Sequence, residues 1–127
     1  MVKPRQGDIY WVKFGRAVDS GPSGKRPAVV IQNNLLNRSN IHTTVVSLLT
    51  SNERLGQVPG NVYLTKGTAN LAKTSVAVVS QIATVDKTRL LEKIGTLSKE
   101  NTEEVVKGCQ MIISLTLFGP HSMELRL

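Results

Sequence analysis

The chain has 127 residues, with 16 Lys and Arg against nine Asp and Glu, which gives a net charge of +7. This length suits one domain that buries its own core without disulfide or metal staples, and we expect that domain to span residues 1–118, with a tail over 119–127. The positive excess lies in residues 1–60, which hold eight basic and three acidic residues, against eight and six in residues 61–127. Such a balance in a small protein favours a polyanionic partner, most simply nucleic acid.

The cysteine content and the hydropathy pattern indicate a reducing compartment. The single cysteine, Cys109, cannot form an internal disulfide, and no run of about twenty apolar residues marks a membrane span. We therefore expect a cytoplasmic protein that does not enter a membrane. Cys109 falls at core spacing within an amphipathic stretch, which predicts a buried packing residue and not a nucleophile.

The residue pattern predicts strands first and one helix late. β-Branched and apolar runs bounded by turn residues predict strands at 7–14, 26–33, 43–50, 61–64, 74–84 and 90–97. Residues 35–40 are too short and polar for more than a turn of helix, and long loops are expected at 15–24 and 51–60. This order predicts a mainly β (α+β) fold: a small, strongly bent antiparallel sheet or barrel, closed on one side by a C-terminal helix.

The predicted helix opens at Ser98, which can cap it, and ends near Phe118-Gly119-Pro120. One apolar stripe is expected to pack on the sheet, at Val105, Cys109, Ile112 and Thr116. A second apolar line exceeds what one small barrel needs to cover, at Val106, Ile113 and Leu117. A homodimer is the natural use of this excess.

Arg26 is the first candidate functional residue. Pro27 fixes its own φ and keeps Arg26 out of the helical region, so the guanidinium leaves a constrained backbone at the start of the buried run 28–31. The preceding loop 15–24 is longer than a hairpin needs and rich in groups that can cover a ligand. A fixed cation beside a long loop is the layout of a phosphate site. The alternative is a rim arginine paired with a surface carboxylate.

The other candidate groups favour chemistry without metal. Two histidines, no CxxC and no acidic pair at ligand spacing leave zinc or two-metal hydrolysis without ligands. RNA cleavage without metal needs charge stabilised on the phosphorane, which Arg26 can supply, and hydroxyls that hold the phosphate, which Thr50 and Ser51 can supply. Ser80 and Gln81 face the same groove or serve as ladder residues at a sheet edge. His42 is expected to be an exposed loop residue.

The aromatic residues argue against base stacking as the main source of affinity. Tyr10, Trp11 and Phe14 share the first strand, where at least half must face the core, so Tyr63 is the main spare aromatic.

Several blocks of the chain, in their order and spacing, resemble the MazF/PemK toxins of type II toxin–antitoxin systems. These blocks lie at residues 7–12, 24–33, 46–50, 75–76, 80–90 and 94–98. The resemblance implies an SH3-like barrel with a C-terminal helix, working as a homodimer. It also implies a ribosome-independent endoribonuclease that cuts single-stranded mRNA at short specific sequences, leaving a 2′,3′-cyclic phosphate and a 5′-hydroxyl. The catalytic arginine and threonine of the family fall on Arg26 and Thr50.

The resemblance also implies partners. An antitoxin with an acidic, largely disordered C-terminal segment would wrap the basic dimer, which fits the charge of +7. No cofactor and no metal are expected. We expect RNA to be contacted from the two long loops and the fifth strand, at Ser20, Lys25, Ser51, Asn52, Ser80 and Gln81.

One departure from the family concerns the fifth strand. Many relatives carry a carboxylate before the glutamine of this block, and some pair it with an arginine two residues earlier, whereas here these positions are Ser80 and Val78. The group that deprotonates the 2′-hydroxyl is therefore open. Two alternatives remain: a non-catalytic gyrase poison like the CcdB proteins, although the helix end at 117–119 has no tryptophan, and a basic RNA-binding module without activity.

Overall fold

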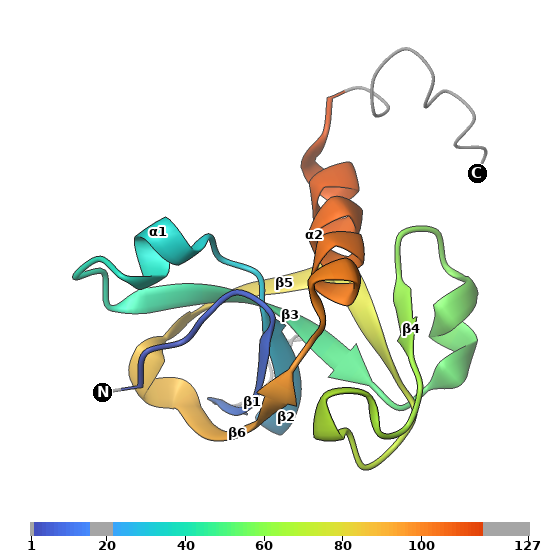
Figure 1. Cartoon of the computed structure of the whole chain (residues 1–127), viewed down its shortest axis with the longest axis horizontal. Helices are drawn as coiled ribbons and strands as arrows, with labels where there is room; N and C mark the ends of the chain where they lie inside the picture. The colour runs from blue at the N-terminus through green and yellow to red at the C-terminus, as the bar shows by residue number, and fades with distance from the viewer. Residues whose placement is uncertain (1, 16–21, 116–127) are drawn as a thin grey trace.

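The chain forms one antiparallel sheet of six strands that curls on itself, with a long helix lying across it (Figure 1). The structure is a computed structural model and describes residues 2–15 and 22–115. The strands lie in the order β4-β5-β3-β2-β1-β6. Their bounds are β1 (Asp8–Phe14), β2 (Gly24–Val30), β3 (Thr43–Thr50), β4 (Val62–Leu64), β5 (Ser75–Asp86) and β6 (Leu90–Thr96). The helices are α1 (Asn34–Asn37) and α2 (Lys99–Ile113), with single 3₁₀ turns at η1 (Glu53–Gln57), η2 (Thr68–Asn70) and η3 (Lys87–Arg89).

The predicted class, a mainly β fold with a bent antiparallel sheet and a C-terminal helix, is confirmed, but one strand boundary is wrong. β2 covers residues 24–30 and not 26–33. The chain leaves the sheet early because Asn33 caps α1, its Oδ1 accepting the Leu35 backbone N–H at 2.7 Å. No helix among residues 2–15 and 22–115 is long and apolar enough to cross a membrane.

The expected end of the long helix is also wrong. Ser98 caps α2 as predicted, its Oγ accepting the Asn101 backbone N–H at 3.1 Å, but the helix ends at Ile113. Most helical stability in proteins comes from packing of an apolar face, and this packing fades along the last turn, where Ile113 is 77% exposed. The predicted stop at Phe118-Gly119-Pro120 lies outside the described residues.

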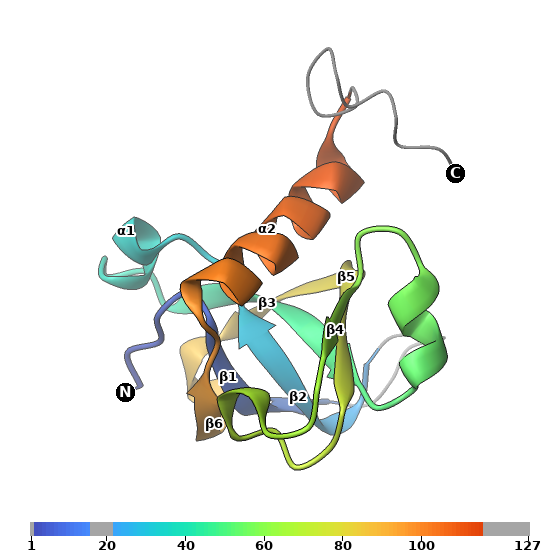
Figure 2. The ribbon, with the colours of Figure 1, turned by 45° about the vertical axis from the view of Figure 1, so that its right-hand side comes forward.

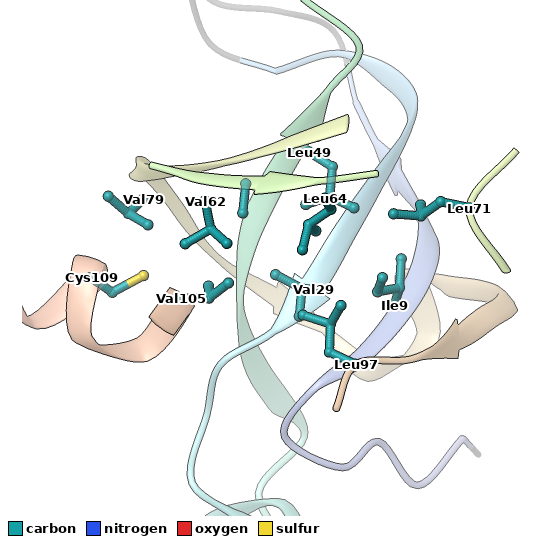
Figure 3. Close-up of a cluster of buried hydrophobic side chains, with 11 residues drawn as sticks. Ile9, Val29, Leu49, Val62, Leu64, Leu71, Val79, Leu97, Val105 and Cys109 are labelled. Carbon is teal, nitrogen blue, oxygen red and sulfur yellow. The ribbon is translucent and has the colours of Figure 1, made fainter. Parts of the chain in front are cut away.

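The central strands are buried on both faces. Ala28 and Val30 belong to one cluster, while Val29 between them belongs to the other, and all three are fully buried. This confirms the prediction of a strand shielded on both sides. Figure 3 shows the first cluster, which gathers side chains from the sheet and from α2, at Ile9, Val29, Leu49, Val62, Leu64, Leu71, Ala77, Val79, Leu97, Val105 and Cys109. The second contains Tyr10, Val12, Ala28, Val30, Val46, Leu48, Val85 and Leu90.

A bulge bends β5 in its middle. Leu48 of β3 pairs with Val78, but the preceding residue Ser47 pairs with Ile82, so residues 79–81 have no partner on β3. The buried Ser47 Oγ donates to the Val78 carbonyl at 3.0 Å, which gives this carbonyl a hydrogen-bond partner beside the bulge. Such insertions bend a strand and raise its twist, which accounts for the curl of the sheet.

Helix α2 lies against β4 and β5, as Figure 2 shows from a second side. Val105 and Cys109 enter the first cluster, as the sequence predicts. The prediction is wrong for Ile112, which is 45% exposed near the end of the helix, and Thr116 lies outside the described residues. Gly108 allows the close approach, because a Cβ at this position would collide with the Gly60 carbonyl oxygen and the Val79 side chain.

Candidate active site

A pocket of about 410 Å³ lies between β1, β2, the end of β3, residues 70–75 around the start of β5, and β6. Its lining residues come from five separate segments: Trp11, Arg26, Pro27, Leu49, Thr50, Ser51, Asn70, Leu71, Ala72, Lys73, Ser75 and Ile94. No carboxylate or imidazole is among these described residues. The pocket is therefore a cationic and hydroxyl-lined site with an apolar wall.

The pocket continues one face of the core. On each central strand the residue two positions beyond a member of the first cluster lines the pocket: Trp11 after Ile9, Pro27 before Val29 and Ser51 after Leu49. Side chains two positions apart share a face of a sheet. The pocket thus begins where the first cluster ends along these strands.

Arg26 lines this pocket from β2, on the segment that the sequence marks as constrained. Its backbone pairs with Val12 on β1, and the next residue, Pro27, pairs with Trp11. The sheet therefore fixes the backbone from which the guanidinium extends. Arg26 is half-buried, and its side chain makes no ion pair or hydrogen bond with any residue in 2–15 or 22–115. A guanidinium held in place without a carboxylate partner remains available to an anion.

Thr50 lines the pocket from the end of β3, where the chain turns away from the sheet. Its Oγ1 accepts the Asn52 backbone N–H at 3.2 Å, and the Asn52 Oδ1 accepts the Arg54 backbone N–H at 3.2 Å. These two turns fix the exit of the strand and hold Ser51 at the pocket wall. The Thr50 hydroxyl accepts in this turn, so its own proton can be donated to a bound oxygen.

The opposite wall comes from the turn around η2. Ala69 and Asn70 both have positive φ, 49° and 64°, which is uncommon for residues with a side chain. Leu71 anchors the turn in the first cluster, and the Asn70 Nδ2 donates to the Ile94 carbonyl at 3.3 Å. Gly95 permits this contact, because a Cβ there would collide with the Ala69 carbonyl. The strained turn presents Asn70 and Lys73 to the pocket.

Lys25 lies beside the pocket and does not line it. Its Nζ is 3.7 Å from the Glu92 Oε1 and 5.1 Å from the centroid of the Trp11 ring. Both members of the ion pair are largely exposed, so the pair contributes little to stability. The arrangement holds the Trp11 ring through a cation–π contact.

The other residues expected to contact RNA are placed differently. Asn52 is exposed and caps η1 beside the pocket. Ser80 and Gln81 are exposed on the bulge of β5 and do not line the pocket, although Thr50 pairs with Val76 on the same strand. Ser20 lies outside the described residues. The structure therefore brings together Arg26, Thr50 and Ser51, with Lys25 and Asn52 at the margin.

Sequence reasoning missed three of the lining residues. Of the three aromatics on β1, at least half were expected to face the core and Trp11 was not singled out, yet it lines the pocket; its position two residues after an apolar residue on the same strand was the available signal. Asn70 and Lys73 have no local signal, because their placement depends on the contact between η2 and β6. Tyr63, the expected spare aromatic, is exposed, and its donation of a hydrogen bond to Glu53 at 2.7 Å raises its pKa.

Within residues 2–15 and 22–115 no three His, Cys, Asp or Glu side chains gather as a metal site would require. The arrangement suits recognition of a phosphodiester: a fixed guanidinium, a hydroxyl donor on the neighbouring strand and an aromatic wall.

Comparison with known proteins identifies the family. Residues 5–113 match the family described as PemK-like, MazF-like toxin of type II toxin-antitoxin system. The chain is 34% identical over 110 residues to Endoribonuclease MazF6 of Mycobacterium tuberculosis, covering 87% of this chain and 96% of that protein. It is 32% identical over 114 residues to Endoribonuclease EndoA of Bacillus subtilis, covering 90% of this chain and 97% of that protein.

A solved structure supports the fold independently. The crystal structure of MazF from Deinococcus radiodurans superposes with a TM-score of 0.72 at 19% identity, covering 88% of this chain and 97% of that one. The sequence match, the curled sheet with its C-terminal helix, and the position of Arg26 and Thr50 at one pocket lead to the same conclusion. This chain belongs to the PemK-like, MazF-like toxins of type II toxin–antitoxin systems.

Proposed function

We propose that this chain is a metal-independent, sequence-specific endoribonuclease that cleaves single-stranded mRNA and so inhibits translation and growth. The observation that carries the proposal is Arg26, a half-buried residue that lines the pocket with Thr50 and whose side chain has no ion-pair partner among the described residues. The relatives reported above are named endoribonucleases, which supports the same reading.

The proposed reaction is a transesterification. The 2′-oxygen attacks the adjacent phosphorus as the bond from phosphorus to the 5′-oxygen breaks, which leaves a 2′,3′-cyclic phosphate and a 5′-hydroxyl. Arg26 stabilises the negative charge that develops on the phosphorane and assists protonation of the leaving 5′-oxygen. Thr50 donates a hydrogen bond that positions the phosphate. The cation and the hydroxyl are held on adjacent strands, so little reorganisation is needed when RNA binds.

The first step lacks an obvious base in this pocket. Its described lining residues include no carboxylate or imidazole, and the positions of the possible dyad on β5 hold Ser80 and Val78. We propose that the proton of the 2′-hydroxyl passes to water or hydroxide and that Arg26 compensates by stabilising the charge that results. In this proposal Ser80 and Gln81 help to recognise the RNA sequence. They contact the part of the RNA that extends beyond the pocket or onto a second protomer.

The partners in this proposal are an antitoxin and a second copy of the chain. A solved structure with a TM-score of 0.74 and 20% identity is an endoribonuclease in complex with its cognate antitoxin from Mycobacterial species, covering 91% of this chain and 99% of that one. We propose that an acidic antitoxin segment covers the basic surface of this protein in the cytoplasm. The exposed apolar side chains of α2, at Ile112 and Ile113, provide a surface for a homodimer.

The test is cleavage of a long, defined single-stranded RNA in the presence of EDTA by the wild type, Arg26→Ala and Arg26→Lys. We expect the wild type to cut at a short recurring sequence and to leave cyclic phosphate ends. Arg26→Ala should lose at least about 100-fold in kcat/KM, while Arg26→Lys keeps the charge but not the planar fork and should fall between them. Unchanged circular dichroism would show that the variants fold.

Near wild-type cutting by Arg26→Ala would refute the assignment of Arg26. Cutting that EDTA abolishes would refute the metal-free mechanism. RNA that is bound but never cut would favour the alternative of a binding module without activity. The gyrase-poison alternative depends on the end of the C-terminal segment, residues 117–119, which lies outside the described residues.

A further inference from the structure

A second and larger cleft lies at the opposite end of β3 from the candidate active site. β3 begins at Thr43, directly after His42 of this cleft, and ends at Thr50 of the pocket. Figure 1 shows the segments that form it, the N-terminal stretch and α1, on the same side of the molecule. The cleft has a volume of about 740 Å³ and is lined by Val2, Lys3, Pro4, Arg5, Asn37, Arg38, Ser39, Asn40, Ile41, His42 and Lys87.

The lining of this cleft is basic. Lys3 and Arg5 come from the N-terminal stretch, Arg38 from the end of α1 and Lys87 from η3. No Asp or Glu is among the described lining residues, and none of these four cations forms an ion pair with a residue in 2–15 or 22–115. Three separate chain segments thus converge to produce an unneutralised positive cleft.

Lys87 is the unusual member of this group. It is only 4% exposed, whereas lysines are almost never fully buried unless they are paired with an opposite charge. Its Nζ donates to the Asn37 carbonyl at 3.1 Å, which is a neutral acceptor. The neighbouring Asp86 carboxylate accepts the N–H and the hydroxyl of Thr88 and does not line the cleft. An anion in the cleft would supply the counter-charge that Lys87 lacks.

A buried polar network holds the floor of the cleft in place. The Asn37 side chain donates to the Gln32 carbonyl at 2.9 Å and accepts from the Thr44 hydroxyl and the Gln32 amide, both at 2.9 Å. Gln32, Asn37 and Thr44 are all buried. Because every member has partners, the network fixes the end of α1 and the carbonyl that positions Lys87. The site is therefore preorganised and does not depend on exposed side chains alone.

We propose that this cleft binds phosphate groups of the substrate RNA on the flank of the cleaved sequence. This inference rests on the proposed function. Lysine and arginine with a nearby amide donor, here Asn40, make the contacts that nucleic-acid phosphates and sugars receive. The described lining has no Trp, Tyr or Phe side chain, and His42 is its one aromatic ring, so we expect the cleft to contact the RNA backbone more than the bases. β3, which is eight residues and about 25 Å long, leads from the cleft to the pocket, and a single RNA strand can span this distance.

The test compares Arg5→Gln/Arg38→Gln with Lys99→Gln/Lys107→Gln, a control of equal charge on exposed positions of α2. Binding of unstructured 2′-O-methyl oligouridylate of about 20 nucleotides is measured against salt concentration, since this probe cannot be cut. Loss of two phosphate contacts should lower the slope of log affinity against log salt concentration by about 1.4. When salt falls from 1 M to 0.1 M, the variant should therefore gain about 25-fold less affinity than the wild type. The control variant should keep the wild-type slope. Lys87→Met, measured in the same way, tests whether the buried lysine at the floor of the cleft contributes to RNA binding.

Kinetics on cleavable RNA separate this inference from the proposed function. For substrates of about 20 nucleotides, KM should rise in the cleft variant with kcat unchanged, while for substrates of about 6 nucleotides both should match the wild type. A wild type that cuts no RNA refutes the proposed function, whatever the cleft does. A cleft variant with the slope and KM of the control overturns the cleft proposal. So does a variant that keeps its RNA affinity but loses affinity for oligoglutamate, since this outcome assigns the cleft to an acidic protein segment.

Discussion

Arg26 on β2 and Thr50 at the end of β3 lie two residues beyond Ala28 and Leu48, the register pair that ends the β2–β3 ladder. Both line the same pocket, one with a cation and the other with a hydroxyl. Continuing the antiparallel register past that last pair brings Arg26 opposite Thr50. The candidate catalytic pair is thus positioned by the sheet itself and not by a flexible loop.

The first prediction concerns the hydroxyl of this pair. Thr50→Val keeps the shape of the side chain but removes the donor, and we expect kcat/KM for RNA cleavage to fall about 100-fold, the usual cost of one preorganised donor. Thr50→Ser, which keeps the hydroxyl, is the matched control and should stay within about tenfold of the wild type. The double variant with Arg26→Ala should be little worse than Arg26→Ala alone, because groups that act on one transition state are not additive. Equal activity of Thr50→Val and Thr50→Ser would remove Thr50 from the mechanism.

The parts of this site that the sequence predicts are those built by local rules. Pro27 and the β-branched run after it indicate a fixed cation before a buried strand, and the strand is present at 24–30. The end of β3 at Thr50 was likewise predictable from its β-branched content. The strands and the cap of α2 follow from periodicity and from Ser98.

The remaining parts depend on contacts between distant segments. Lys73 reaches the pocket because Gly95, more than twenty residues later in the chain, leaves space for the Ala69 carbonyl. The bulge at residues 79–81 follows from the register between β3 and β5 and leaves no mark on hydrophobic periodicity. Lys87 looks like an ordinary surface lysine in sequence, but the Asn37 network buries it.

A second prediction tests Trp11 as a wall against which a base can stack. Trp11→Ala should weaken binding of a short, uncleavable RNA by about 1–3 kcal/mol, the range for one base stacked on an aromatic ring. Trp11→Phe keeps a ring and should recover most of the affinity. Trp11 is partly exposed beside Lys25, so the fold should tolerate both changes. If Trp11→Leu binds as tightly as Trp11→Phe, the wall provides apolar contact and no stacking.

The third prediction tests whether the strained η2 turn builds the pocket. Gly95→Ala should displace the turn, because its Cβ would meet backbone atoms of Ala69 that cannot rotate away. We expect a loss of about 1–3 kcal/mol in the free energy of unfolding and a rise in KM for RNA. Gly67→Ala at the start of the same turn has open space around it but a positive φ of 93°, so it tests backbone strain without the collision. Unchanged KM in Gly95→Ala would show that Asn70 and Lys73 do not contact RNA.

The fourth prediction concerns alkaline stability and Cys109. Burial raises the pKa of the Cys109 thiol, and a hydrogen bond with Ser47 lowers it by a smaller amount. The folded state therefore favours the protonated thiol, so its contribution to stability is complete below the ordinary pKa of 9.0 and is lost as pH rises through the folded pKa. Tyr10, whose pKa is raised by burial and by Asp8, acts in the same direction from 10.0 upward.

Urea unfolding as a function of pH measures this effect. The wild type should lose stability above about pH 9, while Cys109→Ala should be less stable at pH 7, because it loses core volume, but should begin its alkaline decline later. The native thiol should react slowly with a disulfide reagent at pH 8 and rapidly once unfolded. Fast reaction of the native protein would contradict the buried position of Cys109.

The fifth prediction follows from the absence of a carboxylate or imidazole among the described lining residues of the pocket. If hydroxide accepts the proton of the 2′-hydroxyl, kcat/KM should rise about tenfold per pH unit between about pH 6 and 8.5, with no plateau, whereas transfer to water would leave kcat/KM independent of pH in this range. Ser80→Glu would place a carboxylate on the exposed bulge of β5, and a bell-shaped profile in that variant would show that this position reaches the reacting phosphate. A bell-shaped profile in the wild type would instead contradict the proposed mechanism and require a titrating group from outside the described pocket.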